Sequence, residues 1–366
     1  MARQSYDVVI IGAGIAGIAT AYFLAKAGQR VCVLEKSVIG HESTGRCAGN
    51  IGQSHRPPPD LPIAMRAVQL WKQLLQESEL DFEYRQQGNV RLAWNEEHVA
   101  KLKAMVERER AGGLDCYFID RAETRKLLPI VDGPFLGSVY SPTDGSAQPQ
   151  LALLSLARAA TRLGVVIQQH CEVTNVPVTG RGVTGVDTTR GRIDAGAVLN
   201  AAGAWSPHIG QMAGVKIPAE ARRSHLMITE RLPRFMGPVV STDLYGYFRQ
   251  SLSGNVLIGY AARPVEGFER RVTREAVAIA TRRASIIVPQ LGHASLIRAF
   301  TGFTVWTPDL LPIMGPVPNV KGLYVATAFC GLGFATGPAV GELMAELIVT
   351  GRTSVPIEAY RLDRFN

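Results

Sequence analysis

The chain has 366 residues, of which 46% are hydrophobic and 19% charged, so it can bury a large core and is neither disordered nor fibrous. Its net charge is +8, but the basic residues are scattered rather than clustered, which argues against a nucleic-acid surface. The five cysteines are odd in number and lack a CxxC pair, which indicates a reducing compartment and argues against a disulfide framework or a zinc site.

The N-terminal segment predicts a strand–helix–strand unit. Residues 8–11 are a β-branched run typical of a buried parallel strand, residues 18–27 have helical character, and residues 30–34 form a second strand pattern. Two uncharged runs, at 8–25 and 323–341, are long enough to raise the question of a membrane span. Closely spaced glycines interrupt both, so we expect buried strand–turn–helix segments and no transmembrane segment.

A glycine-rich turn joins the first strand to the first helix. Gly12, Gly14 and Gly17 have the spacing that allows a tight turn, a close approach of pyrophosphate and close helix–strand packing. Glu35 ends the second strand, where a carboxylate can accept hydrogen bonds from ribose hydroxyls. The pattern predicts a dinucleotide site but does not distinguish NAD from FAD.

The rest of the chain alternates between two kinds of pattern. Pro57–Pro59 marks a break, and Asp120 with Glu123 forms a capping-box pattern. Further predicted elements are helices at 64–75, 150–163 and 273–287, strands at 165–167 and 197–200, and a meander over 173–194.

Several segments together resemble the D-amino-acid oxidase/glycine oxidase/sarcosine oxidase superfamily of FAD-dependent oxidoreductases. The loop at 46–50 is most like that of the flavin subunits of opine, hydroxyproline or proline dehydrogenases. The matching segments are 8–35, 43–45 with 48–49, 200–206, 307–316, 331–333 with the following helix, and 361–365.

The resemblance implies an α/β fold with a Rossmann-like FAD-binding domain (1–56, 142–215 and 299–366) interleaved with an α+β substrate domain (57–141 and 216–298). It implies noncovalent FAD, with the turn at 331–333 facing the flavin side that becomes negative on reduction. The implied cofactor-binding residues are Gly12, Gly14, Ile15, Ala16, Gly17, Glu35, Lys36, Ser43, Thr44, Gly45, Arg46, Ala48, Gly49, Asn50, Val173, Ala202, Gly203, Trp205, Gly302, Gly331, Leu332, Gly333 and Phe334.

Departures from the superfamily pattern bear on attachment and substrate. Gly302 stands where some relatives tether the flavin through a cysteine, so we expect noncovalent FAD. Thr304 and Ala335 stand where relatives carry cationic substrate anchors. Either another arginine binds the substrate carboxylate, or the substrate is not a simple amino acid.

Two residues that lie two positions apart in an alternating strand pattern are the leading candidates for substrate contact. Alternation places Tyr247 and Arg249 on one face, where a phenol and a guanidinium can hold a carboxylate; ordinary polar residues of a half-exposed strand are the competing interpretation. Arg56, which follows the loop at 46–50 (the flavin loop), is a third candidate. No metal site is expected.

The predicted function is FAD-dependent oxidation of the C–N bond of an amino acid, imino acid or opine. Hydride passes to flavin N5 and leaves an imine that hydrolyses. The alternatives are a free-standing, O₂-using oxidase of glycine or D-amino-acid type and an electron-relaying subunit of a heteromeric complex. The expected partners are a small-molecule substrate and, for the heteromeric readings, a second subunit, but no nucleic acid. The expected location is cytoplasmic, with peripheral attachment at the inner membrane face as an alternative.

Overall fold

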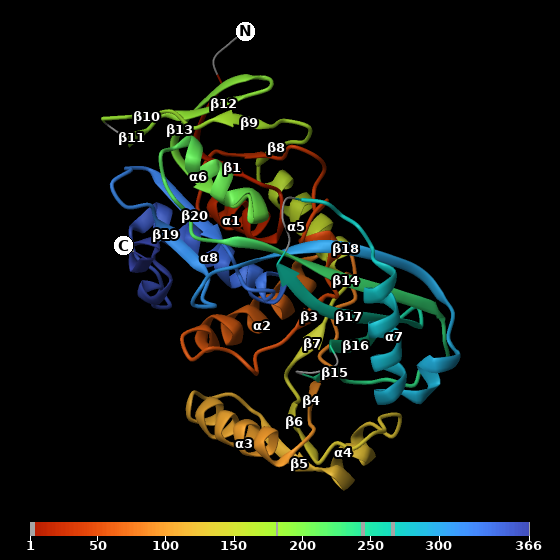
Figure 1. The fold of residues 1–366 in the computed structure, drawn as a ribbon. Coiled ribbons are helices and arrows are strands. Elements are labelled where there is room, and N and C mark those ends of the chain that lie inside the picture. The colour runs from red at the N-terminus through yellow and green to blue at the C-terminus, as the bar shows by residue number, and fades with distance from the viewer. Residues whose placement is uncertain (1–3, 181, 243–245, 265–267, 366) are drawn as a thin grey trace.

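Two eight-stranded sheets organise the chain, with helices packed around them (Figure 1). The computed structural model describes residues 4–180, 182–242, 246–264 and 268–365. The architecture is mixed α/β, as predicted from the sequence.

The first sheet has a parallel centre in the order β20–β13–β1–β2–β8, with β19, β12 and β9 added antiparallel. Its β-branched strands are buried on both faces, as parallel strands usually are. The strands are β1 (Gln4–Ile11), β2 (Val31–Leu34), β8 (Val166–Gln168), β9 (Val173–Asn175), β12 (Gly185–Thr188), β13 (Gly191–Asn200), β19 (Ile313–Pro316) and β20 (Leu323–Thr327).

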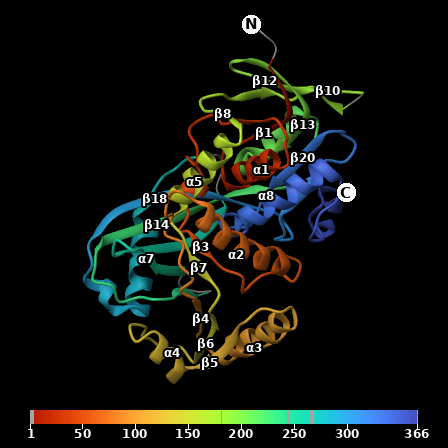
Figure 2. The same cartoon turned by 180° about the vertical axis from the view of Figure 1, so that it is seen from behind.

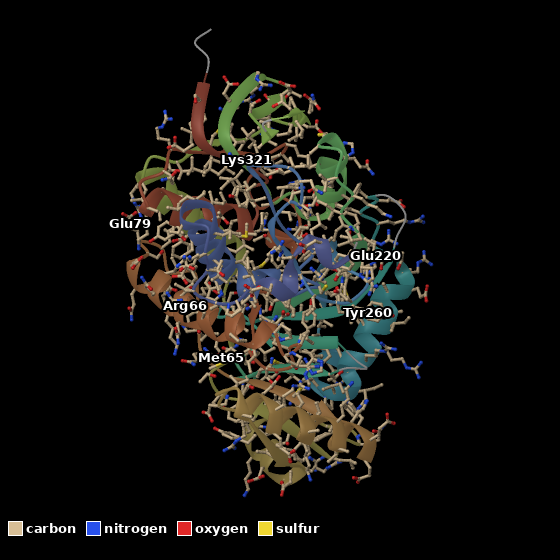
Figure 3. The ribbon with its side chains drawn as sticks, turned by 90° about the vertical axis from the view of Figure 1, so that its left-hand side faces the viewer. Met65, Arg66, Glu79, Glu220, Tyr260 and Lys321 are labelled. Carbon is tan, nitrogen blue, oxygen red and sulfur yellow. The ribbon has the colours of Figure 1, made fainter. Side chains whose placement is uncertain are left out.

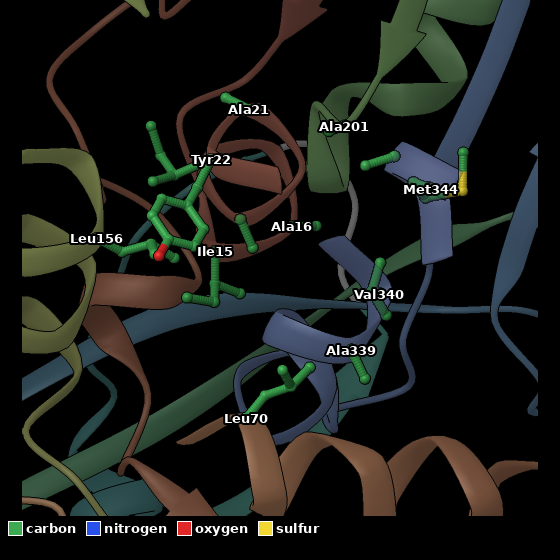
Figure 4. Close-up of a cluster of buried hydrophobic side chains, with 14 of the residues drawn as sticks. Ile15, Ala16, Ala21, Tyr22, Leu70, Leu156, Ala201, Ala339, Val340 and Met344 are labelled. Carbon is green, nitrogen blue, oxygen red and sulfur yellow. The ribbon is translucent and has the colours of Figure 1, made fainter. Parts of the chain in front are cut away.

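Close packing of α1 (Ile15–Lys26) on α8 (Gly333–Thr350) forms the centre of the first core, shown in Figure 4. A Cβ at Gly337 would lie 2.3 Å from Cγ1 of Ile15, and one at Gly341 would lie 2.4 Å from Cβ of Ala19. The two glycines are one helical turn apart, so together they bring the α8 backbone against α1.

Three further helices complete this part of the fold. Helix α2 contacts α8, and its Trp71 donates a hydrogen bond from Nε1 to the Ala335 carbonyl at 2.9 Å. In Figure 3, Met65 and Arg66 mark α2, while Lys321 lies nearer the end that carries the N-terminus. These helices are α2 (Asp60–Glu77), α5 (Pro149–Arg162) and α6 (Ser206–Met212).

The second sheet has the order β18–β14–β17–β16–β15–β4–β6–β5 and is antiparallel except between β15 and β4. The strands are β4 (Asn89–Ala93), β5 (Tyr117–Asp120), β6 (Gly137–Ser141), β14 (Glu220–Arg231), β15 (Val239–Thr242), β16 (Gly246–Gln250), β17 (Asn255–Pro264) and β18 (Leu296–Trp306). Its helices are α3 (Glu96–Ala111), α4 (Arg121–Leu127) and α7 (Arg274–Ile287). Figure 2 shows α3 and α4 at the end far from the N-terminus.

The remaining elements are short. They are the pairs β3 (Asn50–Ile51) with β7 (Gly145–Ser146) and β10 (Val178–Thr179) with β11 (Gly182–Val183), and the 3-10 helices η1 (Thr44–Arg46), η2 (Gly203–Trp205), η3 (Pro289–His293), η4 (Glu358–Tyr360) and η5 (Leu362–Phe365).

The predicted elements are confirmed with small shifts of their ends. Asp120 caps α4 in a capping box with Glu123, as its spacing predicts, and Thr273 caps α7. The strand expected at 197–200 is the end of the longer β13. The predicted domain boundaries remain a prediction; the boundary at 299 falls inside β18, and α2, assigned to the substrate domain, packs in the first core.

Candidate functional site

A cavity with about 1320 Å³ of empty space, part of it open to solvent, lies where α1, α8 and β18 meet. Elements far apart in the sequence supply its walls. The predicted cofactor-binding residues that line it are Gly12, Gly14, Ile15, Ala16, Glu35, Lys36, Ser43, Thr44, Val173, Ala202, Gly203, Trp205, Gly331, Gly333 and Phe334.

The glycine-rich turn allows two close backbone contacts. Gly12 has φ +107°, and a Cβ there would lie 2.6 Å from the Ala201 carbonyl oxygen. A Cβ at Gly17 would lie 2.0 Å from the Gly12 carbonyl oxygen, so the helix packs closely on the strand as the spacing predicts. These contacts involve rigid backbone, so a side chain at either position distorts the turn.

Glu35 reaches the turn from the end of β2 and lines the cavity. Its Oε2 accepts a hydrogen bond from the Ala13 amide at 3.0 Å, and its Oε1 accepts one from the Ser37 amide at 2.8 Å. Each carboxylate oxygen can accept a second hydrogen bond. The side chain is therefore held in place beside the cavity with capacity for a ribose hydroxyl.

Helix α1 begins at the cavity wall. The amide of Ile15 donates to Oγ1 of Thr44 at 3.1 Å, and a Cβ at Gly14 would lie 3.3 Å from the same oxygen. The remaining amides of the first helical turn have no partner within the helix. Together with the helix dipole they favour an anionic group at this end of the cavity.

Helix α8 begins at the same cavity after a strained turn. Ala328 and Cys330 have φ of +57° and +49°, a left-handed conformation that is costly for residues with a Cβ, and Gly331 follows with φ +86°. Gly333 and Phe334 of the first helical turn line the cavity. The turn thus presents a second helix N-terminus to any group inside.

One end of the cavity carries an aromatic and cationic cluster that the sequence did not fully reveal. Lys36 Nζ lies 3.3 Å from the ring centroid of Trp205, and Phe268 stacks on Trp205 with centroids 4.4 Å apart. Arg270 lies 3.5 Å from Oε1 of Glu42, another lining residue. Nothing in the glycine-rich motif indicates Glu42, Phe268 or Arg270, because they meet only through tertiary packing.

The other predicted cofactor residues do not line the cavity, and their roles stay predictions. A Cβ at Gly302 would lie 2.9 Å from Cβ of Arg46, so the Arg46 side chain crosses the space that a tethering side chain at 302 would need. Arg46 also donates from Nη1 to the Thr301 carbonyl at 3.3 Å. The residues in this group are Gly17, Gly45, Arg46, Ala48, Gly49, Asn50, Gly302 and Leu332.

Tyr247 and Arg249 lie on one face of β16, beside the loop at 46–50. Arg249 is only 3% exposed; its Nε donates to the Ala48 carbonyl and its Nη2 donates to the Ala147 carbonyl at 3.3 Å. Burial lowers the pKa of Arg249 to about 10 and raises the pKa of Tyr247. Neither residue lines the cavity itself, but Cys47, which is close enough to interact electrostatically with both side chains, does.

Arg56, the third candidate for substrate contact, is buried outside the cavity. It is 4% exposed and donates from Nη2 to the Gly52 carbonyl, while its Nε and Nη1 are buried without a hydrogen-bond partner. Burial lowers the pKa of Arg56, and the carboxylates of Asp60 and Asp144 oppose that shift. Arg56 does not line the cavity, so a role in substrate binding stays a prediction.

Thr304 and Ala335, the two positions without a cationic anchor, both accept hydrogen bonds from tryptophan side chains of the protein. Oγ1 of Thr304 accepts from Nε1 of Trp306 at 2.7 Å, and the Ala335 carbonyl accepts from Trp71. In the described ranges, no three or more His, Cys, Asp and Glu side chains gather where they could hold a metal ion. Likewise, no helix within the described residues has both the length and the apolar character needed to cross a bilayer.

The cavity fits a bound FAD on its own geometry. Two helix N-termini open on it, the backbone of the glycine turn leaves no room for a Cβ, and a fixed carboxylate stands beside it. The match that decides the family covers almost the whole chain: FAD dependent oxidoreductase (DAO), over residues 7–347. The chain belongs to the DAO family of FAD-dependent oxidoreductases. It is therefore an enzyme with FAD as its cofactor, and noncovalent attachment is typical of this family.

Known members of the family are similar over nearly full length. The beta subunit of sarcosine oxidase from Arthrobacter sp. is 30% identical, over 99% of this chain and 92% of its own. L-proline dehydrogenase from P. horikoshii superposes with a TM-score of 0.95 at 32% identity, covering 99% of this chain and 98% of its own. Glycine oxidase from Geobacillus kaustophilus superposes with a TM-score of 0.92 at 26% identity, covering 98% of each chain. The predicted superfamily is confirmed.

Proposed function

We propose that this enzyme oxidises the C–N bond of an N-substituted or cyclic α-amino acid, with Arg249 and Tyr247 binding the substrate carboxylate. The relatives named for sarcosine and proline support this substrate class. Opines, which are also N-substituted amino acids, belong to the same proposal.

The observation that carries the proposal is the buried guanidinium of Arg249. Its two hydrogen bonds go to the carbonyls of Ala48 and Ala147, and within the described residues it forms no salt bridge. A guanidinium has five N–H donors, and burying one without a carboxylate partner is costly. A substrate carboxylate would supply the missing negative charge beside the flavin loop.

The side chains of β16 and the N-terminus of α8 then have separate roles in the reaction. Arg249 and Tyr247 fix the carboxylate, so that the α-carbon is oriented toward the cofactor. The N-terminus of α8 stabilises negative charge that develops in the cavity. FAD held in the cavity would supply the two-electron oxidant: it would take the hydride, which carries both electrons, from the α-carbon, and the imine product would hydrolyse in water. No side chain needs to act as a base on the α-carbon in this scheme.

The experiment is an anaerobic screen of the purified protein, with flavin bleaching as the readout. Sarcosine, L- and D-proline, glycine, D-alanine and representative opines are mixed with the enzyme in turn. Bleaching by at least one N-substituted or cyclic amino acid, faster than by glycine, is the expected result. Bleaching by primary amino acids alone, or by none of the compounds, would contradict the proposed substrate class.

The same preparation tests the electron acceptor. The similarity to a beta subunit supports an enzyme that works with a partner subunit, and the similarity to L-proline dehydrogenase supports a dehydrogenase, whereas the similarity to glycine oxidase supports a free-standing oxidase. We favour the partnered enzyme, because Thr304 and Ala335 replace the anchors typical of the oxidases. The odd number of cysteines without a CxxC pair supports a reducing compartment, the cytoplasm, as its location. Slow reoxidation of the reduced protein by O₂, but rapid reoxidation by an artificial dye, is the expected result.

A further inference from the structure

A row of four residues crosses the second sheet on the face that carries Tyr247. Tyr247 in β16 pairs with Gly259 in β17, and Gly259 pairs with Leu226 in β14. Leu226 in turn pairs with Phe300 in β18. The four strands lie side by side in Figure 1. Directly paired residues on neighbouring strands share a face, so these four side chains form one continuous strip.

The strip contains one position without a side chain, and the Tyr247 ring occupies that space. A Cβ at Gly259 would lie 2.0 Å from Cζ, 2.1 Å from Cε2 and 2.6 Å from Cε1 of Tyr247. No real Cβ approaches a ring carbon so closely, so the ring crosses directly over Gly259. The backbone at Gly259 does not have a positive φ, so the glycine is not required there by its own conformation.

The face that carries this strip is turned toward the flavin loop. Ala48 of that loop packs in one cluster with Leu226 and Leu257, and with Tyr247 and Phe300 at its edge. The cluster is apolar apart from the phenol. A ring that lies flat on the sheet leaves the most room between the sheet and the loop, and a ring lifted off the sheet takes that room away.

We propose that Gly259 is a positioning residue that sets the depth of the substrate site by letting the Tyr247 ring lie flat on β17. The inference rests on the proposed function and deepens it. The apolar strip favours a substrate with a carboxylate and a carbon frame larger than that of glycine. An alanine at 259 pushes the ring by more than 1 Å toward the loop, because a normal contact needs about 3.5–4 Å.

The test uses carboxylates that cannot be oxidised, so it does not depend on turnover. Acetate, cyclopentanecarboxylate and cyclohexanecarboxylate are titrated into the FAD-loaded enzyme, and the perturbation of the flavin spectrum gives each Kd. Gly259→Ala should weaken cyclohexanecarboxylate at least tenfold more than it weakens acetate, whose binding is affected only through the displaced Tyr247 phenol. Gly237→Ala is the matched control, since a Cβ there has no heavy atom within 4 Å.

A double variant separates this role from a general packing defect. In a Tyr247→Ala background there is no ring to displace. Adding Gly259→Ala should therefore leave all three Kd values within twofold of those of the Tyr247→Ala single variant. If Gly259→Ala alone fails to fold but the double variant folds, the ring contact has a packing role only, and this result would count against the positioning role. Equal weakening of all three probes in both backgrounds would overturn it.

The outcomes also separate this inference from the proposed function. If the parent enzyme binds the carboxylates and oxidises an amino acid, but Gly259→Ala does not discriminate by size, only the positioning role fails. If no carboxylate perturbs the flavin and no amino acid bleaches it, the proposed function and this inference fail together.

Discussion

Polar groups are hydrogen-bonded differently in two regions of the molecule. One is the cofactor cavity, and the other is the pair of segments that flank β3 and β7, which we call the junction. Around the cavity, the carboxylate of Glu35 and the hydroxyl of Thr44 are hydrogen-bonded to backbone amides of the glycine turn. At the junction, the charged side chains of Arg249, Arg56 and Asp144 are buried, and Arg56 and Asp144 have atoms without partners. The first region is therefore preorganised by its own chain, whereas the second carries charge that substrate or protonation can compensate.

The largest expected effect comes from removing charge at the junction. Losing one side of a buried guanidinium–carboxylate pair costs about 3–5 kcal/mol, so Arg249→Ala should lower the rate of flavin reduction per substrate concentration at least about a hundredfold. Anaerobic stopped-flow reduction measures it, with Arg249→Lys as the charge-preserving control. FAD content should persist, because Arg249 does not line the cavity. Reduction as fast as in the parent would make Arg249 purely structural.

The second prediction concerns Asp144, which precedes β7 and accepts hydrogen bonds from the backbone amide and the side chain of Gln53, just after β3. Burial raises the pKa of Asp144 from 3.8 to about 6, so the folded protein holds this proton more tightly than the unfolded chain. The stabilisation is fully present below pH 3.8 and is lost as pH rises through about 6. The shift corresponds to about 3 kcal/mol.

Asp144→Asn keeps an acceptor for the Gln53 amide and removes the charge. Its stability relative to the parent should therefore increase between pH 4 and pH 7, as measured by urea unfolding at each pH. A difference in unfolding free energy that does not change with pH would show that Asp144 has an ordinary pKa.

At the cavity the expected effect is smaller and falls on the cofactor. Glu35→Ala removes charge-assisted hydrogen bonds to ribose and the support of the Ala13 amide, a loss of about 1.5–3 kcal/mol, or roughly tenfold or more in FAD affinity. The Kd for FAD of the reconstituted apoprotein measures it. Glu172→Ala, another lining residue, is the matched control. Equal FAD affinity in the Glu35→Ala variant and the parent would remove Glu35 from the ribose site.

The last prediction concerns the attachment of FAD to the protein. We expect no covalent bond between them, so acid denaturation should be sufficient to separate the two. Arg46 crosses the space at Gly302 where a tether would stand. Precipitation with acid should release all the yellow colour into the supernatant. Colour retained in the pellet would show a covalent link and would redirect attention to the cysteines near the cavity, Cys47 and Cys171.

Much of the cofactor region could be predicted because its signals are local. Gly12, Gly14 and Gly17 stand next to the strand and helix they join, so their spacing alone indicates the turn, and Glu35 follows at the end of the next strand. The same holds for the capping box of α4, in which Asp120 and Glu123 are three residues apart.

Long-range contacts carried information that no spacing contains. The sequence places Tyr247 and Arg249 on one face of a strand, but only the pairing of β16 with β17 puts the Tyr247 ring over Gly259. The sequence offers Arg56 as a substrate residue, and only tertiary packing shows that it is buried beside acidic side chains; its role in substrate binding stays a prediction.

The sequence by itself determined the turn, the secondary structure and the family, because these depend on residues close together in the chain. The tertiary structure alone decided which side chains share a surface. Strand register, helix packing and desolvation act between residues that are distant in sequence, and they set the charge and depth of the substrate site.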